Sequence, residues 1–166
     1  MRDPSDTPDN GKIVHQLGFL TLYAAYLEEK IDDLLLMLDP IDCYTEDKQR
    51  WPISKRIKHA IGVIRKLDPQ AFSVLVSDLT VCLDLFEERN ELIHGRIYSK
   101  HDEGHILRSG RRNRPDREVT SGELNSLANE IFHARLAIDG PMIVDIPKAI
   151  LEKASGTNER RDSKKE

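Results

Sequence analysis

The chain has 166 residues, of which 39% are hydrophobic and 33% charged, and its formal net charge is −4. This balance excludes a chain without a core, and the length suits one domain. Two separated cysteines, Cys43 and Cys82, argue against a zinc or disulfide framework. The acidic N-terminus and the short apolar runs lead us to expect a cytoplasmic protein with no secretory signal and no membrane span.

The first predicted element is a long helix over residues 12–38, after a disordered lead at 1–11 and before the stop at Asp39-Pro40. Its apolar residues alternate in spacing between four and three, which is a heptad seam: Ile13, Leu17, Leu20, Ala24, Leu27, Ile31, Leu34 and Leu38. A second stripe widens the apolar face: Phe19, Leu22, Tyr23 and Tyr26. Either the rest of the chain or a second copy must cover it.

Two more helices follow a loop at residues 40–50. Pro52 suits the first turn of a helix that ends near Leu67. Asp68 is then placed to cap a third long helix, which starts at Pro69 and ends at Gly95, a residue that accepts the left-handed conformation after a helix.

The helical pattern disappears between residues 96 and 119, where RIYSK and HILRS predict a small hairpin or an extended loop. Thr120 and Glu123 form a capping box for a further helix, which Gly140-Pro141 is expected to end. A short helix near 145–153 and a disordered tail at 154–166 complete a single helical domain over residues 12–153.

Positive charge is concentrated in two segments, each with seven Lys or Arg residues: 46–67, with two acidic residues, and 96–117, with three. Such segments can hold a polyanion, although a solvated surface gives the same pattern.

The apolar seam of the third helix turns polar in its last turn. It passes through Leu79, Leu83 and Phe86 and then meets Asn90 and His94, which lie four residues apart on one face, with Arg89 beside them. A polar group on a core face needs a partner. Three structural roles would supply one: a hydrogen bond from Asn90 across the bundle, a favourable helix end for His94, and a carboxylate pair for Arg89.

The same three residues also suit RNA cleavage without a metal or cofactor. His94 would take the proton of a ribose 2′-hydroxyl, Arg89 would stabilise charge on the phosphate, and Asn90 would orient one of them. The products would be a 2′,3′-cyclic phosphate and a 5′-hydroxyl. The neighbouring basic residues would bind the RNA backbone: Arg96, Lys100, Arg108, Arg111 and Arg112.

The stretch ERNELIHG resembles the signature of HEPN-domain proteins, an Arg followed by a polar residue, three further residues and a His, with Arg89, Asn90 and His94 at those positions. The resemblance covers residues 12–140. It implies an up-and-down helical bundle, so we expect an all-α bundle of four to five helices. The hairpin or loop predicted from the local pattern would be inserted after the third helix. It also implies a homodimer and a metal-independent endoribonuclease, with an antitoxin or defence-system partner in toxin–antitoxin or antiviral phage-defence systems.

Other members of that family have lost catalysis and bind RNA or protein, which leaves a non-catalytic module as the alternative. One departure concerns regulation: the toxin branch carries a modifiable tyrosine two residues after the histidine, where this chain has Arg96, and the nearest tyrosine is Tyr98.

Two groups of acidic or histidine residues are further candidates for metal binding. His101 and His105 flank Asp102 and Glu103, although Gly104 favours a loop there. The helix 12–38 carries four carboxylates that a divalent ion or Arg89 could use, or that simply face solvent: Glu28, Glu29, Asp32 and Asp33.

Overall fold

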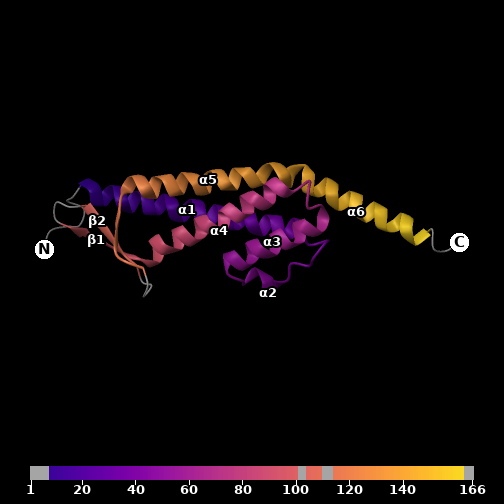
Figure 1. Cartoon of the computed structure of the whole chain (residues 1–166), viewed down its shortest axis with the longest axis horizontal. Coiled ribbons are helices and arrows are strands. Elements are labelled where there is room, and N and C mark those ends of the chain that lie inside the picture. Colours follow the sequence, from indigo (N-terminus) through magenta and orange to yellow (C-terminus); the bar gives the residue numbers. More distant parts are fainter. Residues whose placement is uncertain (1–7, 101–103, 110–113, 163–166) are drawn as a thin grey trace. The chain divides into compact units, whose positions relative to one another are not determined.

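A computed structural model describes residues 8–100, 104–109 and 114–162 (Figure 1). Most of the described residues are helical, which confirms the expected mainly helical class. They are α1 (Pro8–Met37), α2 (Glu46–Gln49), α3 (Ile53–Leu67), α4 (Ser73–His94), α5 (Ser121–Ile143) and α6 (Asp145–Asp162). The strands are β1 (Arg96–Lys100), β2 (Gly104–Arg108) and β3 (Arg117–Val119). No helix in the described part of the chain is long and apolar enough to cross a membrane.

The described residues divide into two compact units. We call residues 8–27 with 84–133 the sheet unit, and residues 28–83 with 134–162 the helical unit. Each unit has its own buried apolar side chains. The prediction of one domain over residues 12–153 stays a prediction.

The predicted seam of α1 is buried almost throughout. In the sheet unit, Ile13, Leu20, Ala24 and Leu27 are at most 4% exposed, and only Leu17 is half-buried. In the helical unit, Ile31, Leu34 and Leu38 are fully buried. The heptad spacing therefore identified the core face of this helix correctly. The second stripe is not fully covered within the described chain, because Leu22 and Tyr26 stay 43% and 41% exposed.

The sheet of the sheet unit is antiparallel, in the order β1-β2-β3. The two predicted strand-like pieces form β1 and β2, and β2 begins at Gly104 with a φ of 87°, in the region that favours glycine. Strand β3 was not predicted. One face of the sheet is core: Leu107 of β2 and Val119 of β3 are at most 1% exposed.

Gly95 joins α4 to this sheet at close range. A Cβ atom there would clash with Leu107 Cδ1 and lie 2.8 Å from the carbonyl oxygen of Glu91. Close approach of β2, rather than a left-handed φ, therefore explains this glycine. The contact fixes the strand directly against the last turn of α4.

Two helix boundaries in the helical unit differ from the prediction because tertiary packing overrides local signals. Pro141 lies inside α5, so the expected stop at Gly140-Pro141 is wrong. Ile138 and Met142, one turn apart, are both buried and hold the helix across the proline. Asp68 caps the turn that precedes α4, since its Oδ1 accepts from the amides of Gln70 and Ala71, but the helix itself begins at Ser73.

The ends of the helical region also extend further than expected. Helix α1 begins at Pro8, within the predicted lead at 1–11, and α6 continues past residue 153 to Asp162. Lys153 Nζ donates to the carbonyl of Lys66 at 2.6 Å, which ties α6 to the end of α3. The predicted loop at 40–50 contains the short helix α2, capped by Thr45.

Candidate functional site

The last two turns of α4 carry the three predicted site residues. Arg89 and Asn90 are half-buried, and His94 is exposed. Arg89 Nη1 donates to Asn90 Oδ1 at 3.0 Å, so these neighbours form one polar pair. Arg89 Nε is buried and makes no hydrogen bond within the described chain. The pair thus presents donor groups whose bonding capacity is not used up by the protein.

His94 is the final residue of α4, and no described residue forms a hydrogen bond or an ion pair with its ring. The Gly95 amide donates to the carbonyl of Glu91 at 3.0 Å, which keeps the helical bonding intact up to this end. An exposed histidine at this helix end can be reached by water and by a ligand. Among the described residues, the partner of Arg89 is Asn90 rather than the expected carboxylate, and Asn90 bonds within its own helix rather than across the bundle.

An ion-pair network fixes this turn to the rest of the sheet unit. The Glu91 side chain is only 9% exposed and pairs with Arg114 and with Arg117, whose Nε lies 3.5 Å from Glu91 Oε1. Arg117 Nη1 also donates to Glu123 at 2.5 Å. Glu123 belongs to the predicted cap of α5, whose Thr120 Oγ1 accepts from the Glu123 amide at 3.1 Å. The network therefore connects the end of α4, β3 and the start of α5.

Sequence reasoning missed Glu91 as an anchor. Its ion-pair partners lie more than 20 residues downstream, and only the sheet brings them to α4. The only signal in the sequence is a carboxylate within the motif itself, which does not by itself indicate burial.

The structure describes the side chains of two of the five predicted RNA-binding residues. Arg96 and Arg108 are exposed on the sheet, and Arg108 Nε lies 3.2 Å from Asp116 Oδ2. The side chain of Lys100 and the whole of Arg111 and Arg112 lie outside the described residues. The structure therefore brings two of the five together on one strand pair, since Arg96 and Arg108 are register partners.

Most of the residues considered for metal binding are buried, engaged in ion pairs or outside the described residues. His105 is buried on β2, and His101, Asp102 and Glu103 lie outside the described residues. Glu28 and Asp32 both pair with Arg56 of α3, at 3.2 and 2.5 Å. Within the described ranges, no three His, Cys, Asp or Glu side chains are grouped as a metal site.

Arg56 is a buried charge that sequence reasoning did not single out. In the sequence it is one of seven basic residues in a segment, yet its side chain is only 10% exposed. Asp32 also accepts a hydrogen bond from the Tyr44 hydroxyl at 2.7 Å, and burial together with this bond raises the pKa of Tyr44 to about 12. Glu28 and Asp32 thus serve a structural ion pair within the helical unit.

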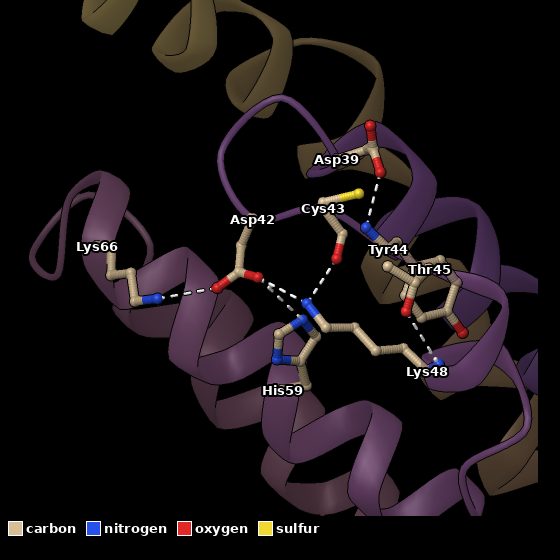
Figure 2. Close-up of polar contacts among 8 residues, drawn as sticks. All are labelled: Asp39, Asp42, Cys43, Tyr44, Thr45, Lys48, His59 and Lys66. Atoms are coloured by element: carbon tan, nitrogen blue, oxygen red, sulfur yellow. Dashed lines mark hydrogen bonds and ion pairs between the residues drawn. The ribbon is translucent and has the colours of Figure 1, made fainter.

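A second charged cluster of the helical unit surrounds Asp42, as Figure 2 shows. Its carboxylate accepts from Lys48 Nζ at 2.7 Å and from Lys66 Nζ at 3.0 Å, and these hydrogen bonds lower the pKa of Asp42 to about 2. His59 Nε2 lies 3.8 Å from the same carboxylate. Burial, reinforced by the charges of Lys48 and Lys66, lowers the pKa of His59.

Comparisons with known proteins find no matching family model, no matching curated protein and no matching solved structure for this chain.

Proposed function

We propose that the protein is a metal-independent endoribonuclease of the HEPN type, with its site at Arg89, Asn90 and His94. The observation that carries this proposal is the change in exposure along the last two turns of α4. A half-buried Arg89–Asn90 pair, bonded at 3.0 Å, lies beside an exposed His94 on a turn anchored through Glu91. A charged phosphodiester needs fixed donors next to a base that water and substrate can reach.

The proposed reaction is an internal displacement at phosphorus. Neutral His94 accepts the proton of a ribose 2′-hydroxyl, and the 2′-oxygen forms a bond to the adjacent phosphorus. The bond from phosphorus to the 5′-oxygen breaks, and that oxygen takes up a proton from water or from a protonated His94 of a second copy. Arg89 stabilises the developing charge on the phosphate, and Asn90 holds the guanidinium in place through their hydrogen bond.

The test compares wild type with His94→Ala on total RNA in the presence of EDTA, followed by mapping of the RNA ends. We expect cleavage with 2′,3′-cyclic phosphate ends from wild type and a loss of at least about 100-fold in the variant. His133→Ala is the matched control, because His133 is another exposed histidine of the sheet unit. Cleavage that survives in His94→Ala, or that requires a metal, would contradict the proposal.

A role in toxin–antitoxin or phage-defence systems extends this proposal and brings in a partner protein such as an antitoxin. Growth arrest upon expression of wild type, but not of His94→Ala, is its expected signature.

The alternative function is a non-catalytic module that binds RNA or protein. It is favoured by one observation: no described residue orients the His94 ring through a hydrogen bond, and Asn90 is already engaged by Arg89. This alternative predicts RNA binding without turnover, weakened when Arg111 and Arg112 are replaced by glutamate. A steep dependence of affinity on salt would identify phosphate contacts and separate RNA from a protein ligand.

A further inference from the structure

The sheet has an outward face whose composition differs sharply from its core face. Alternation along β1 places Arg96 and Tyr98 on this side, and the register with β2 places Arg108 and Ile106 opposite them. Arg96, Tyr98 and Arg108 are all exposed, while Leu107, of the other face, is fully buried. The outward face therefore presents one aromatic ring among arginines.

Tyr98 lies on this face opposite its register partner Ile106. It is 46% exposed, and the guanidinium of Arg108 lies 5.6 Å from the centre of its ring. Because β1 is an edge strand, one side of the ring borders no further described strand. An exposed aromatic ring on a sheet, flanked by arginine, is the arrangement on which proteins stack the bases of single-stranded RNA.

The charges on this face suit a polyanion. Arg96 and Arg108 both face outward. Glu118, the register partner of Ile106, is the acidic residue among the described outward positions. Arg108 does pair with Asp116, but these side chains are 63% and 45% exposed. An ion pair at such exposure contributes little, so a phosphate can replace the carboxylate at small cost.

The outward face is also tied to the proposed site by the chain itself. Tyr98 follows His94 by four residues, and four extended residues span at most about 14 Å between Cα atoms. The chain therefore keeps the Cα atoms of His94 and Tyr98 within this distance of each other.

We infer that the outward face of β1 and β2 is a binding platform for single-stranded RNA, with one base stacked on Tyr98 and the backbone held by Arg96 and Arg108. This inference rests on the proposed function only in taking RNA as the ligand. Stacking reads no base edge, so the platform selects unpaired RNA rather than a particular sequence.

The test measures binding of a fluorescein-labelled single-stranded RNA 12-mer by anisotropy, in the His94→Ala background so that the RNA stays intact. We expect Tyr98→Thr, which keeps a strand-forming residue, to weaken binding roughly 5- to 100-fold, and Tyr98→Phe to stay within about twofold. Tyr26→Ala is the matched control, since Tyr26 is similarly exposed at 41% and should leave affinity unchanged. Arg108→Gln should reduce the slope of log affinity against log salt by about one.

The results separate this inference from the proposed function. Unchanged affinity in a folded Tyr98→Thr variant, equal loss in Tyr98→Phe, or equal effects on a duplex of the same length would overturn the platform, while cleavage by His94 could still be found. Binding that depends on Tyr98, combined with no cleavage by wild type, would support the platform and contradict the endoribonuclease.

Discussion

His94 of the sheet unit and His59 of the helical unit are both helical histidines close to ion pairs, yet their surroundings differ. His59 is 17% exposed, its ring meets Trp51 edge-on at 5.6 Å, and it lies within the Asp42 cluster of Figure 2. His94 is exposed at the end of α4, and the Glu91 network lies beside it rather than around it. A charged network can thus enclose a histidine or merely support the turn that carries one.

The difference has a clear physical consequence. Enclosure removes water from His59, and the nearby Lys48 and Lys66 disfavour a further positive charge, so its pKa falls despite the attraction of Asp42. The Nε2 atom of this ring is buried, which leaves it poorly placed to reach a substrate. We therefore interpret the helical unit's charges as structural and keep the proposed chemistry with His94. Three predictions test this division, beginning with the largest effect.

The largest effect is expected from Arg56→Met, which removes the buried charge of the helical unit. Asp32 and Glu28 would lose their shared partner while each remains about two-thirds buried, at 36% and 34% exposure. We expect a loss of about 3 kcal/mol in the free energy of unfolding, measured with urea. Arg50→Met is the control, because that arginine is 78% exposed in a weak pair with Glu46, and it should change stability by less than about 0.5 kcal/mol.

If the charges of the helical unit are only structural, folded Arg56→Met protein should cleave RNA like wild type well below its melting temperature. A specific loss of cleavage in protein that circular dichroism shows to be folded would break the division between the two units.

Local signals in the sequence predicted much of this fold. The seam of α1, the two strands after α4 and the Thr120 cap of α5 each depend on residues within a few positions of one another. Features that depend on distant partners were missed. Strand β3 needs β2 as its neighbour, and α5 continues through Pro141 because burial of Ile138 and Met142 outweighs the local preference.

In the candidate site, too, local features could be predicted from the sequence and contacts with distant residues could not. The arrangement of Arg89, Asn90 and His94 at one end of a helix follows from helical geometry alone, and the structure adds their exposure and the Arg89–Asn90 bond. The burial of Glu91 could not be predicted, because it requires Arg114 and Arg117 to be delivered by the segment after the hairpin. Arg56 was hidden for the same reason, since a basic segment does not reveal which arginine faces a carboxylate.

A smaller loss of stability is expected from Glu91→Gln, which tests whether the network of the sheet unit supports the site. The amide cannot satisfy Arg114 and Arg117 as a carboxylate does, but both arginines keep access to water, at 44% and 35% exposure. We expect about 2 kcal/mol by urea unfolding, together with reduced RNA cleavage in the folded variant. Glu88→Gln, an exposed neighbour on the same helix, is the control, and an equal effect of both variants would contradict an anchoring role.

The smallest effect concerns the enclosed histidine and depends on pH. A histidine side chain ordinarily has a pKa of about 6.5, and the surroundings of His59 lower its pKa in the folded state. Well above the ordinary pKa the ring is neutral in both the folded and the unfolded state, so its protonation does not affect the free energy of unfolding. As the pH falls from there toward the lowered folded pKa, the unfolded chain binds a proton that the folded chain does not, and stability decreases. The free energy of unfolding measured with urea should therefore be lower at pH 5.5 than at pH 7.5 in wild type. This decrease should be smaller in His59→Phe.

The titration of His59 itself gives a direct measurement of the same enclosure. In an NMR titration, its midpoint should lie below the ordinary histidine pKa and rise in Lys48→Met, because that variant removes one of the opposing charges. Lys55→Met is the control, since Lys55 lies over the Trp51 ring and is not among the charges that lower the pKa of His59. A midpoint at or above the ordinary value would mean that burial and the lysine charges do not outweigh the attraction of Asp42, which would contradict the enclosure of His59.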